Sequence, residues 1–158
     1  MSARVVTDYR ALAELLAAER RRGRTVTLTN GCFDVLHVGH VRLLEGARGQ
    51  SDVLVVALNS DASARANKGA GRPCVPLTER MEIVAALAGV DFVTSFDEPT
   101  AAVLIETLRP DVYVKGTDWT PETIPERDAV AACGGRVAIA GDPKTHASSD
   151  LIAKLRRS

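Results

Sequence analysis

The stretch TNGCFDVLHVGHVRLL, residues 29–44, leads from a predicted strand into a predicted helix and contains two of the three histidines of the chain. The β-branched run TVTLTN, residues 25–30, predicts a buried strand, and a helix is expected from about residue 39 to residue 48. The first amides of a helix are unpaired and lie at the positive end of its dipole. A strand-to-helix turn of this kind therefore favours phosphate.

Several features of this turn favour an anionic ligand. Gly31 has no Cβ, so the backbone can approach a ligand closely, and the amides of Cys32 and Phe33 follow at the helix start. His37 and His40 are three residues apart and share one face of the first helical turn. Two imidazoles there can donate hydrogen bonds to phosphate oxygens. The turn therefore predicts a phosphate-binding site, although the G-x-G-x-x-G pattern of dinucleotide folds is absent.

Two other interpretations of the histidine pair remain open at this point. Histidines three residues apart also occur on solvated helix faces. The second alternative is a zinc site with Cys32 or Asp34 as an additional ligand, because imidazole and thiolate are ordinary zinc ligands. No paired Cys or His spacing occurs elsewhere in the chain. The place of the pair after the first predicted strand favours the phosphate site, and no residue is assigned as a metal ligand.

Outward from this stretch, apolar runs alternate with helical patterns. Further strands are expected over residues 52–59, 91–96, 111–116 and 136–141. Helices are expected over residues 6–23, 78–90, 98–110, 122–135 and 148–158, and the polar, glycine-rich segment 60–76 is predicted to be a loop. Asp8, Thr78 and either Ser148 or Ser149 are expected to cap helices. Five strands separated by helices predict an α/β fold with a single doubly wound, Rossmann-like, five-stranded parallel sheet flanked by helices.

The totals of the chain restrict the classes of function. A length of 158 residues predicts a single domain over residues 1–158, with an N-terminal helix in 1–23 and an α/β core, which contains the phosphate-binding turn, in 24–158. The 20 acidic and 20 basic residues cancel, so diffuse binding to nucleic acid or to an anionic membrane is not expected. No apolar run approaches the roughly 20 residues that span a bilayer, and the N-terminus lacks a signal-peptide pattern. Three scattered cysteines favour a reduced, cytoplasmic compartment.

The motif GCFDVLHVGH, residues 31–40, matches the G-x-F-D-x-x-H-x-G-H signature of the HxGH nucleotidyltransferase superfamily, which is cytidylyltransferase-like. That superfamily includes glycerol-3-phosphate cytidylyltransferase and phosphopantetheine adenylyltransferase. Three longer stretches resemble D-glycero-β-D-manno-heptose 1-phosphate adenylyltransferase, alone or as the C-terminal half of the bifunctional heptose enzyme. They are VVALNSDASARANKGAGRPCVPLTERMEIVAAL (55–87), VDFVTSFDEPT (90–100) and PDVYVKGTDW (110–119).

This resemblance implies transfer of AMP from ATP to a heptose 1-phosphate, with an ADP-heptose and pyrophosphate as products. It assigns His37 and His40 to the triphosphate, Lys68 to a mobile loop that closes over phosphates, and Arg80 to a functional role at the start of a helix. Arg72 is a weaker second candidate in the same loop. Mg²⁺ is expected to accompany ATP, bound largely by phosphates and water. A homodimer is expected by analogy with the relatives.

Polar residues at other strand and helix ends complete the predicted site. Asn59, Asp61, Lys115 and Gly116 are expected to frame the nucleoside or the sugar phosphate. The free amides and hydroxyls of Ser148 and Ser149 are expected to cradle the β- and γ-phosphates. Relatives often carry I-S-T-T or S-T-T at that place, where this chain has Ala147, and Lys144 and His146 are expected to substitute. Trp119 is a candidate for stacking, and Asp34 is expected to brace the first turn.

Two alternative functions stay open on the sequence. One is a CTP-dependent cytidylyltransferase that acts on a polyol phosphate such as glycerol 3-phosphate, since VKGTDW, residues 114–119, resembles both groups. The other is a nucleotide-binding regulator without chemistry, which predicts ATP binding and no product.

Overall fold

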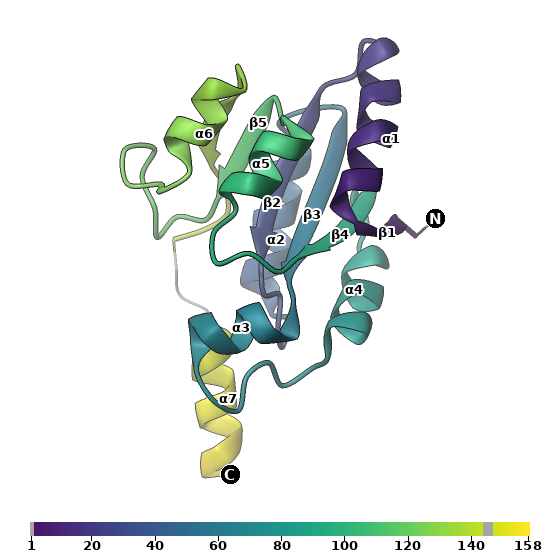
Figure 1. Cartoon of the computed structure of the whole chain (residues 1–158). Coiled ribbons are helices and arrows are strands. Elements are labelled where there is room, and N and C mark those ends of the chain that lie inside the picture. The colour runs from purple at the N-terminus through teal and green to yellow at the C-terminus, as the bar shows by residue number, and fades with distance from the viewer. Residues whose placement is uncertain (1, 144–146) are drawn as a thin grey trace.

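The computed structural model describes residues 2–143 and 147–158 (Figure 1). Its strands are β1 (Arg4–Asp8), β2 (Val26–Gly31), β3 (Val53–Asn59), β4 (Phe92–Phe96), β5 (Val112–Lys115) and β6 (Arg136–Ile139). The helices are α1 (Tyr9–Arg21), α2 (Val38–Arg48), α3 (Asp61–Lys68), α4 (Leu77–Ala85), α5 (Ala102–Leu108), α6 (Arg127–Ala132) and α7 (Ser148–Arg157). The strands form one sheet in the order β1-β4-β3-β2-β5-β6, and each described pair is parallel. The predicted α/β class, a parallel sheet flanked by helices, is confirmed.

Both faces of this sheet are covered by helices, as the continuous apolar runs in its strands require. Every residue of β3 is buried. Val53, Val55 and Ala57 face the core under α1, α5 and α6, while the alternate residues of β3 face the core under α2 and α4. Figure 1 shows α3 and α7 away from these layers, beyond the carboxyl ends of the strands. The two layers fix the sheet, and α3 and α7 are left to shape what lies at its carboxyl edge.

The chain changes direction at β2, in the middle of the sheet. After β2 it adds β3 and then β4 on one side, whereas β5 and β6 lie on the other side. In doubly wound folds, ligands bind beyond the carboxyl ends of the strands at such a switch point. The topology therefore points to the ends of β2 and β5 as the place for a site.

The expectation of five strands is wrong, because β1 adds a sixth. It pairs in parallel with β4 at the edge of the sheet, with Arg4 opposite Phe92 and Val5 opposite Val93. Four of its five residues are exposed, so it lacks the buried apolar run that marked the other strands. The helical pattern of residues 6–23 overlaps this strand and led to the prediction of a helix there, although Val5, Val6 and Thr7 are β-branched residues that favour strands. The N-terminal segment that was expected to be a helix is thus a strand, Arg4–Asp8, followed by a helix, Tyr9–Arg21.

The expected loop over residues 60–76 is also wrong in its first half, where α3 forms. Ser60 caps this helix by accepting a hydrogen bond from the amide of Ser63 at 3.1 Å. Asp61 lies in the first turn, and Arg65 and Lys68 lie in the last, each at the end of the helix dipole that suits its charge. Because α3 has a mostly polar surface, its sequence lacks the apolar stripe by which helices are usually recognised.

Of the helix caps expected from the sequence, the structure confirms the one at α1 and differs at α4 and α7. Asp8 caps α1 by accepting from the amide of Arg10 at 2.9 Å, which confirms that prediction. Thr78 does not cap α4, which begins one residue earlier, and Asp61 instead accepts from the Leu77 amide at 2.9 Å. Neither serine caps α7, since its N-cap is Ala147 and no side chain accepts there. In the described part of the chain, no helix has the length and apolar character needed to cross a membrane.

Candidate functional site

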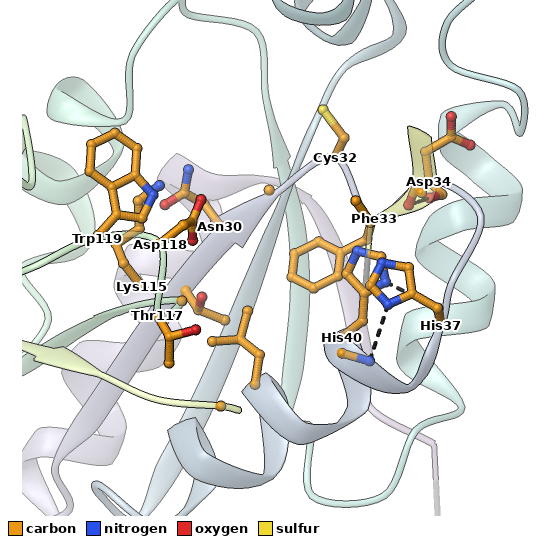
Figure 2. A pocket seen from close by; sticks show the side chains of 18 of the residues that line it. Asn30, Cys32, Phe33, Asp34, His37, His40, Lys115, Thr117, Asp118 and Trp119 are labelled. Atoms are coloured by element: carbon orange, nitrogen blue, oxygen red, sulfur yellow. Dashed lines mark hydrogen bonds between the residues drawn. The ribbon is translucent and has the colours of Figure 1, made fainter. Parts of the chain in front are cut away.

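A pocket of about 320 Å³ lies at the switch point, beyond the ends of β2, β5 and β6 (Figure 2). The turn after β2, the start of α2, the end of α3 and the loop that follows it, the loops after β5 and β6, and the start of α7 all contribute to its lining. It includes these predicted residues: Gly31, Cys32, Phe33, His37, His40, Lys68, Lys115, Gly116, Ser148 and Ser149. Segments far apart in the sequence therefore meet where the topology predicts a ligand.

His37 and His40 open α2 and lie against each other, with ring centroids 4.0 Å apart. Nδ1 of His40 accepts a hydrogen bond from the backbone amide of His37 at 3.2 Å, and Nδ1 of His37 accepts from that of Gly39 at 3.1 Å. An imidazole whose Nδ1 accepts has its neutral-form proton on Nε2, at the other side of the ring. The helix start thus sets the tautomer of both rings that line the pocket.

Burial keeps His40 neutral. Together with the neighbouring His37 and Lys68, burial lowers the pKa of His40 to about 4, and Asp34 opposes this only in part. The ring of Phe33 covers it, with centroids 5.4 Å apart. At neutral pH His40 is therefore a hydrogen-bond donor without charge.

Cys32, which the zinc alternative would use, lies half-buried in this turn. Burial raises the pKa of the Cys32 thiol, against the opposing charges of Lys68 and Arg80, so the thiol stays protonated. Its Sγ lies 3.7 Å from Oδ1 of Asn59. Within residues 2–143 and 147–158, no group of three or more His, Cys, Asp or Glu side chains is arranged to bind a metal.

Lys68 is the last residue of α3 and lines the pocket, so a helix fixes its backbone and the predicted mobile loop does not contain it. Gly69 ends the helix with a φ of +99°, a conformation that L side chains rarely adopt. Arg72 follows in the connecting segment and also lines the pocket, and its Nε donates to Oδ2 of Asp34 at 3.0 Å. Two cations thus reach the pocket from the same side.

The opposite wall is built at the end of β5. Figure 2 shows Lys115 and Trp119 across the pocket from the two histidines. Nζ of Lys115 lies 5.3 Å from the ring centroid of Trp119 and 6.0 Å from that of Tyr113. Burial lowers the pKa of Lys115, while Glu126 and Asp118 act in the other direction. This wall combines one cation with the aromatic ring of Trp119, and Tyr113 is buried behind it.

Asn30, at the carboxyl end of β2, is a lining residue that the predicted site did not include. The Tyr113 hydroxyl donates to its Oδ1, and burial raises the pKa of that phenol, so the donor stays protonated. The bond orients the amide, so that Nδ2 is the group with hydrogens left to donate. Thr117 and Asp118 are two further lining residues that were missed. Asn30 is the next-to-last residue of β2, and Thr117 and Asp118 follow shortly after β5, so the ends of the buried strands were the signal for all three.

Arg80 lies behind the pocket rather than in its lining. It is only 1% exposed, and its Nε donates to the Val75 carbonyl at 2.8 Å. One Nη donates to the carbonyls of Cys32 and Asn59 at 2.7 and 2.9 Å, and the other donates to Asp61 at 2.7 Å. Four of the five N–H groups of a guanidinium are used in this way. A direct catalytic contact would require Arg80 to leave these partners.

Asn59 and Asp61 share this position behind the pocket and do not line it. Nδ2 of Asn59 donates to the Ser63 hydroxyl at 2.9 Å, and Asp61 accepts from Arg80 and from the start of α4. Ser148 lines the pocket, but its hydroxyl donates to the carbonyls of Asp34 and Val35 rather than to the interior. Lys144 and His146, predicted to substitute for the missing groups before α7, lie outside the described residues.

The comparison with known families decides where the chain belongs. A family model described as cytidylyltransferase-like matches residues 28–149, which include the histidine turn and the start of α7. The chain belongs to the cytidylyltransferase-like family. The expected relation to that superfamily is therefore confirmed.

Individual relatives are similar over nearly the whole chain. A protein named bifunctional protein HldE from Syntrophotalea carbinolica is 50% identical over 145 residues, which are 92% of this chain and 30% of that protein. A protein of the same name from Geotalea uraniireducens is 51% identical over 151 residues, 96% of this chain and 31% of that protein. The chain thus spans about a third of the length of these relatives.

A solved structure shares the fold. It is described as a lipopolysaccharide core biosynthesis protein from Thermoplasma volcanium, and it superposes with a TM-score of 0.64 at 26% sequence identity. The match covers 74% of this chain and 94% of that one.

Proposed function

We propose that this chain transfers AMP from ATP to a heptose 1-phosphate and releases pyrophosphate. The observation that carries the proposal is the pocket at the switch point, where two histidines with fixed tautomers open a helix and face lysine and arginine side chains. Similarity to the proteins named HldE supports the choice of reaction, together with the heptose-enzyme resemblance of residues 55–119.

The reaction asks for positioning and charge stabilisation. A phosphate oxygen of the sugar 1-phosphate attacks the α-phosphorus of ATP, and the bond from that phosphorus to the bridging oxygen breaks as pyrophosphate leaves. The attacking oxygen is already anionic, so no enzyme base has to remove a proton. His37 and His40 donate to triphosphate oxygens, where negative charge grows in the transition state. A neutral donor such as His40 does so without changing its own protonation.

The cations of the pocket divide between the two substrates. Lys68 and Arg72 approach from the side of α3 and meet the leaving phosphates, while Lys115 approaches from β5 and meets the sugar phosphate. The second assignment follows from charge, because a second phosphate has to be brought beside the first against their mutual repulsion.

We also propose that Mg²⁺ accompanies ATP. The pocket has the carboxylates Asp118 and Asp142 in its lining, and one or two carboxylates beside substrate phosphates suit this ion. When bound, it neutralises charge on the phosphates. A homodimer and a cytoplasmic location, expected from the sequence, stay predictions, and light scattering tests the first.

The proposal is tested by a pyrophosphate-release assay in which each of the four nucleoside triphosphates is offered with heptose 1-phosphate or glycerol 3-phosphate. Release with ATP and heptose 1-phosphate, and with no other pair at a comparable rate, is the expected result. Release only with CTP and glycerol 3-phosphate would replace the proposal with the cytidylyltransferase alternative. ATP binding without any product would favour the regulator.

A further inference from the structure

The segment 69–76 joins α3 to α4 and forms one side of the pocket, and we call it the strap. It contains Arg72 and begins directly after Lys68, so its path decides where both cations lie. The strap has little packing of its own, since none of its residues is buried. Gly69 and Gly71 both have positive φ values, +99° and +81°. A segment of this kind needs contacts from elsewhere to keep one path.

The side chain of Asp34 supplies those contacts. It is 2% exposed, and its Oδ2 accepts from the Cys74 amide at 2.8 Å and from Nε of Arg72 at 3.0 Å. Its Oδ1 accepts from the Val75 amide at 3.0 Å. All three donors belong to the strap. Burial raises the pKa of Asp34, but these three hydrogen bonds and the charge of Arg72 outweigh burial, and the pKa lies below its ordinary value.

The backbone around Asp34 is a rigid base for this contact. Phe33 and Val35 on either side have φ values of +50° and +52°, which is an uncommon conformation and a strained one for a β-branched residue. Such strain persists only where the surroundings determine the conformation. Ser148 does so by donating to the carbonyls of Asp34 and Val35, and Arg80 does so by donating to that of Cys32. The turn that leads to the histidines is therefore also the anchor of the strap.

We propose that Asp34 is a positioning residue, which holds the strap so that Arg72 and Lys68 face the triphosphate together with His37 and His40. This inference rests on the proposed function. Asp34 does not itself touch a ligand, because both of its oxygens accept from the strap. The two Nη nitrogens of Arg72 make no hydrogen bond among the described residues. Arg72 thus bridges a buried carboxylate, through Nε, to the space of the pocket.

The test is a mutant cycle on nucleotide binding, with Asp34→Asn, Arg72→Ala and the double variant. Calorimetry measures the Kd of α,β-methylene-ATP with Mg²⁺, which needs no acceptor and no turnover. Asp34→Asn and Arg72→Ala are each expected to weaken binding about tenfold, because the first releases the Arg72 guanidinium and the second removes it. The double variant is expected to be within about twofold of the weaker single variant, since residues that act as one unit are not additive.

Asp91→Asn is the matched control. Asp91 also joins a backbone amide to an arginine, accepting from Leu54 at 2.8 Å and from Arg48 at 3.0 Å, but it lies at the other end of the sheet. It is expected to lower the urea midpoint without changing the Kd. Arg72→Lys adds a test that leaves the buried carboxylate in place. One ammonium cannot bridge Asp34 and a ligand as a guanidinium does, so binding at least about fivefold weaker than in the parent is expected.

Parent-like binding by Asp34→Asn or by Arg72→Lys overturns the inference, as do effects that multiply in the double variant. If Asp34→Asn does not fold, the Arg72→Lys result decides alone. The proposed function fails separately: a protein that shows the expected cycle with the analogue and makes no product from heptose 1-phosphate keeps this inference and loses that proposal.

Discussion

The two ends of the sheet use the same chemistry for different purposes. At the amino end, Asp52, Asp91 and Asp111 directly precede β3, β4 and β5. They accept from the amides of Thr25, Leu54 and Val26 at 2.9, 2.8 and 2.8 Å. At the carboxyl end, Asp34 and Asp61 also accept from backbone amides, those of the strap and of the start of α4.

The difference lies in what the carboxylates fasten. Those at the amino end join the start of one strand to the start of its neighbour, so they hold adjacent strands of the sheet together. Those at the carboxyl end fasten loops and a helix start that surround the pocket, while α2 presents its first turn there with two histidines. Parallel strands put all helix starts at one edge, and this polarity makes only that edge suitable for phosphate.

The largest expected effect of breaking this comparison is on catalysis at the carboxyl end. His40→Ala removes a donor to the triphosphate and is expected to lower kcat/KM by about 10²- to 10³-fold, as loss of one transition-state donor does. Its stability should fall by only about 1 kcal/mol, since the ring also accepts from the backbone at the start of α2. Steady-state pyrophosphate release and urea denaturation measure the two quantities. A variant with parent-like kcat/KM would remove His40 from the mechanism.

The next largest expected effect is a difference in stability between substitutions of two arginines, Arg80 at the carboxyl end of the sheet and Arg48 at the amino end. Arg80→Met leaves three carbonyls behind the pocket without a donor and is expected to lower the free energy of unfolding by about 3 kcal/mol. Arg48→Met is the control, because Arg48 also bonds a carboxylate and a carbonyl but its side chain is 40% exposed. A loss below about 1 kcal/mol is expected there. Equal losses in urea denaturation would show that burial of Arg80 does not set its effect.

A smaller effect is expected from the amino end alone. Asp111→Ala removes the acceptor of the Val26 amide and is expected to cost about 1 kcal/mol of stability. The kcat/KM should stay within about twofold of the parent, because the change lies at the other end of the strands from the pocket. Thermal unfolding and the pyrophosphate assay give both values. A tenfold loss of activity in a folded protein would contradict the separation of the two ends.

The sequence predicted the buried strands and the histidine turn because both depend on local patterns. Val53–Asn59 is a continuous apolar run, and His37 and His40 belong to a motif whose spacing already implies a helix start. Asn30, Thr117 and Asp118 lie at or shortly after strand ends, which marks their place but not their role, and only the folded sheet shows that they line the pocket. The mostly polar helix α3 and the exposed strand β1 were not predicted, because neither has a regular spacing of apolar residues by which it could be recognised.

Arg80 shows the limit of residue-type reasoning most clearly. The family resemblance assigned Arg80 a functional role at the start of a helix, where an arginine opposes the helix dipole. The structure shows that its side chain leaves the helix surface and reaches carbonyls at the ends of two strands. Those partners are 48 and 21 residues away in the sequence, so no local pattern could have named them.

The smallest effect expected at neutral pH is the effect of protonation on stability. It sharpens the comparison because the titrating groups at the two ends of the sheet lose their contributions over different pH ranges. His40 has a pKa of about 4 in the folded chain, below the ordinary value of about 6.5. Between these values the unfolded chain binds more protons, so stability from the neutral ring is complete above pH 6.5 and is lost as the pH falls toward 4. Asp52 at the amino end has a pKa lowered first by the Thr25 amide and then by its hydroxyl. The contribution of Asp52 to stability is complete above the ordinary pKa of an aspartate and is lost only as the pH falls below that pKa.

Urea denaturation from pH 4.5 to 7.5 should therefore show a free energy of unfolding that rises with pH in the parent and in Asp52→Asn, but not in His40→Gln. ATP should raise the pKa of His40 in NMR titrations, because a bound anion favours the charged ring. An unchanged slope in His40→Gln would mean that the ring is not the group that titrates at the carboxyl end.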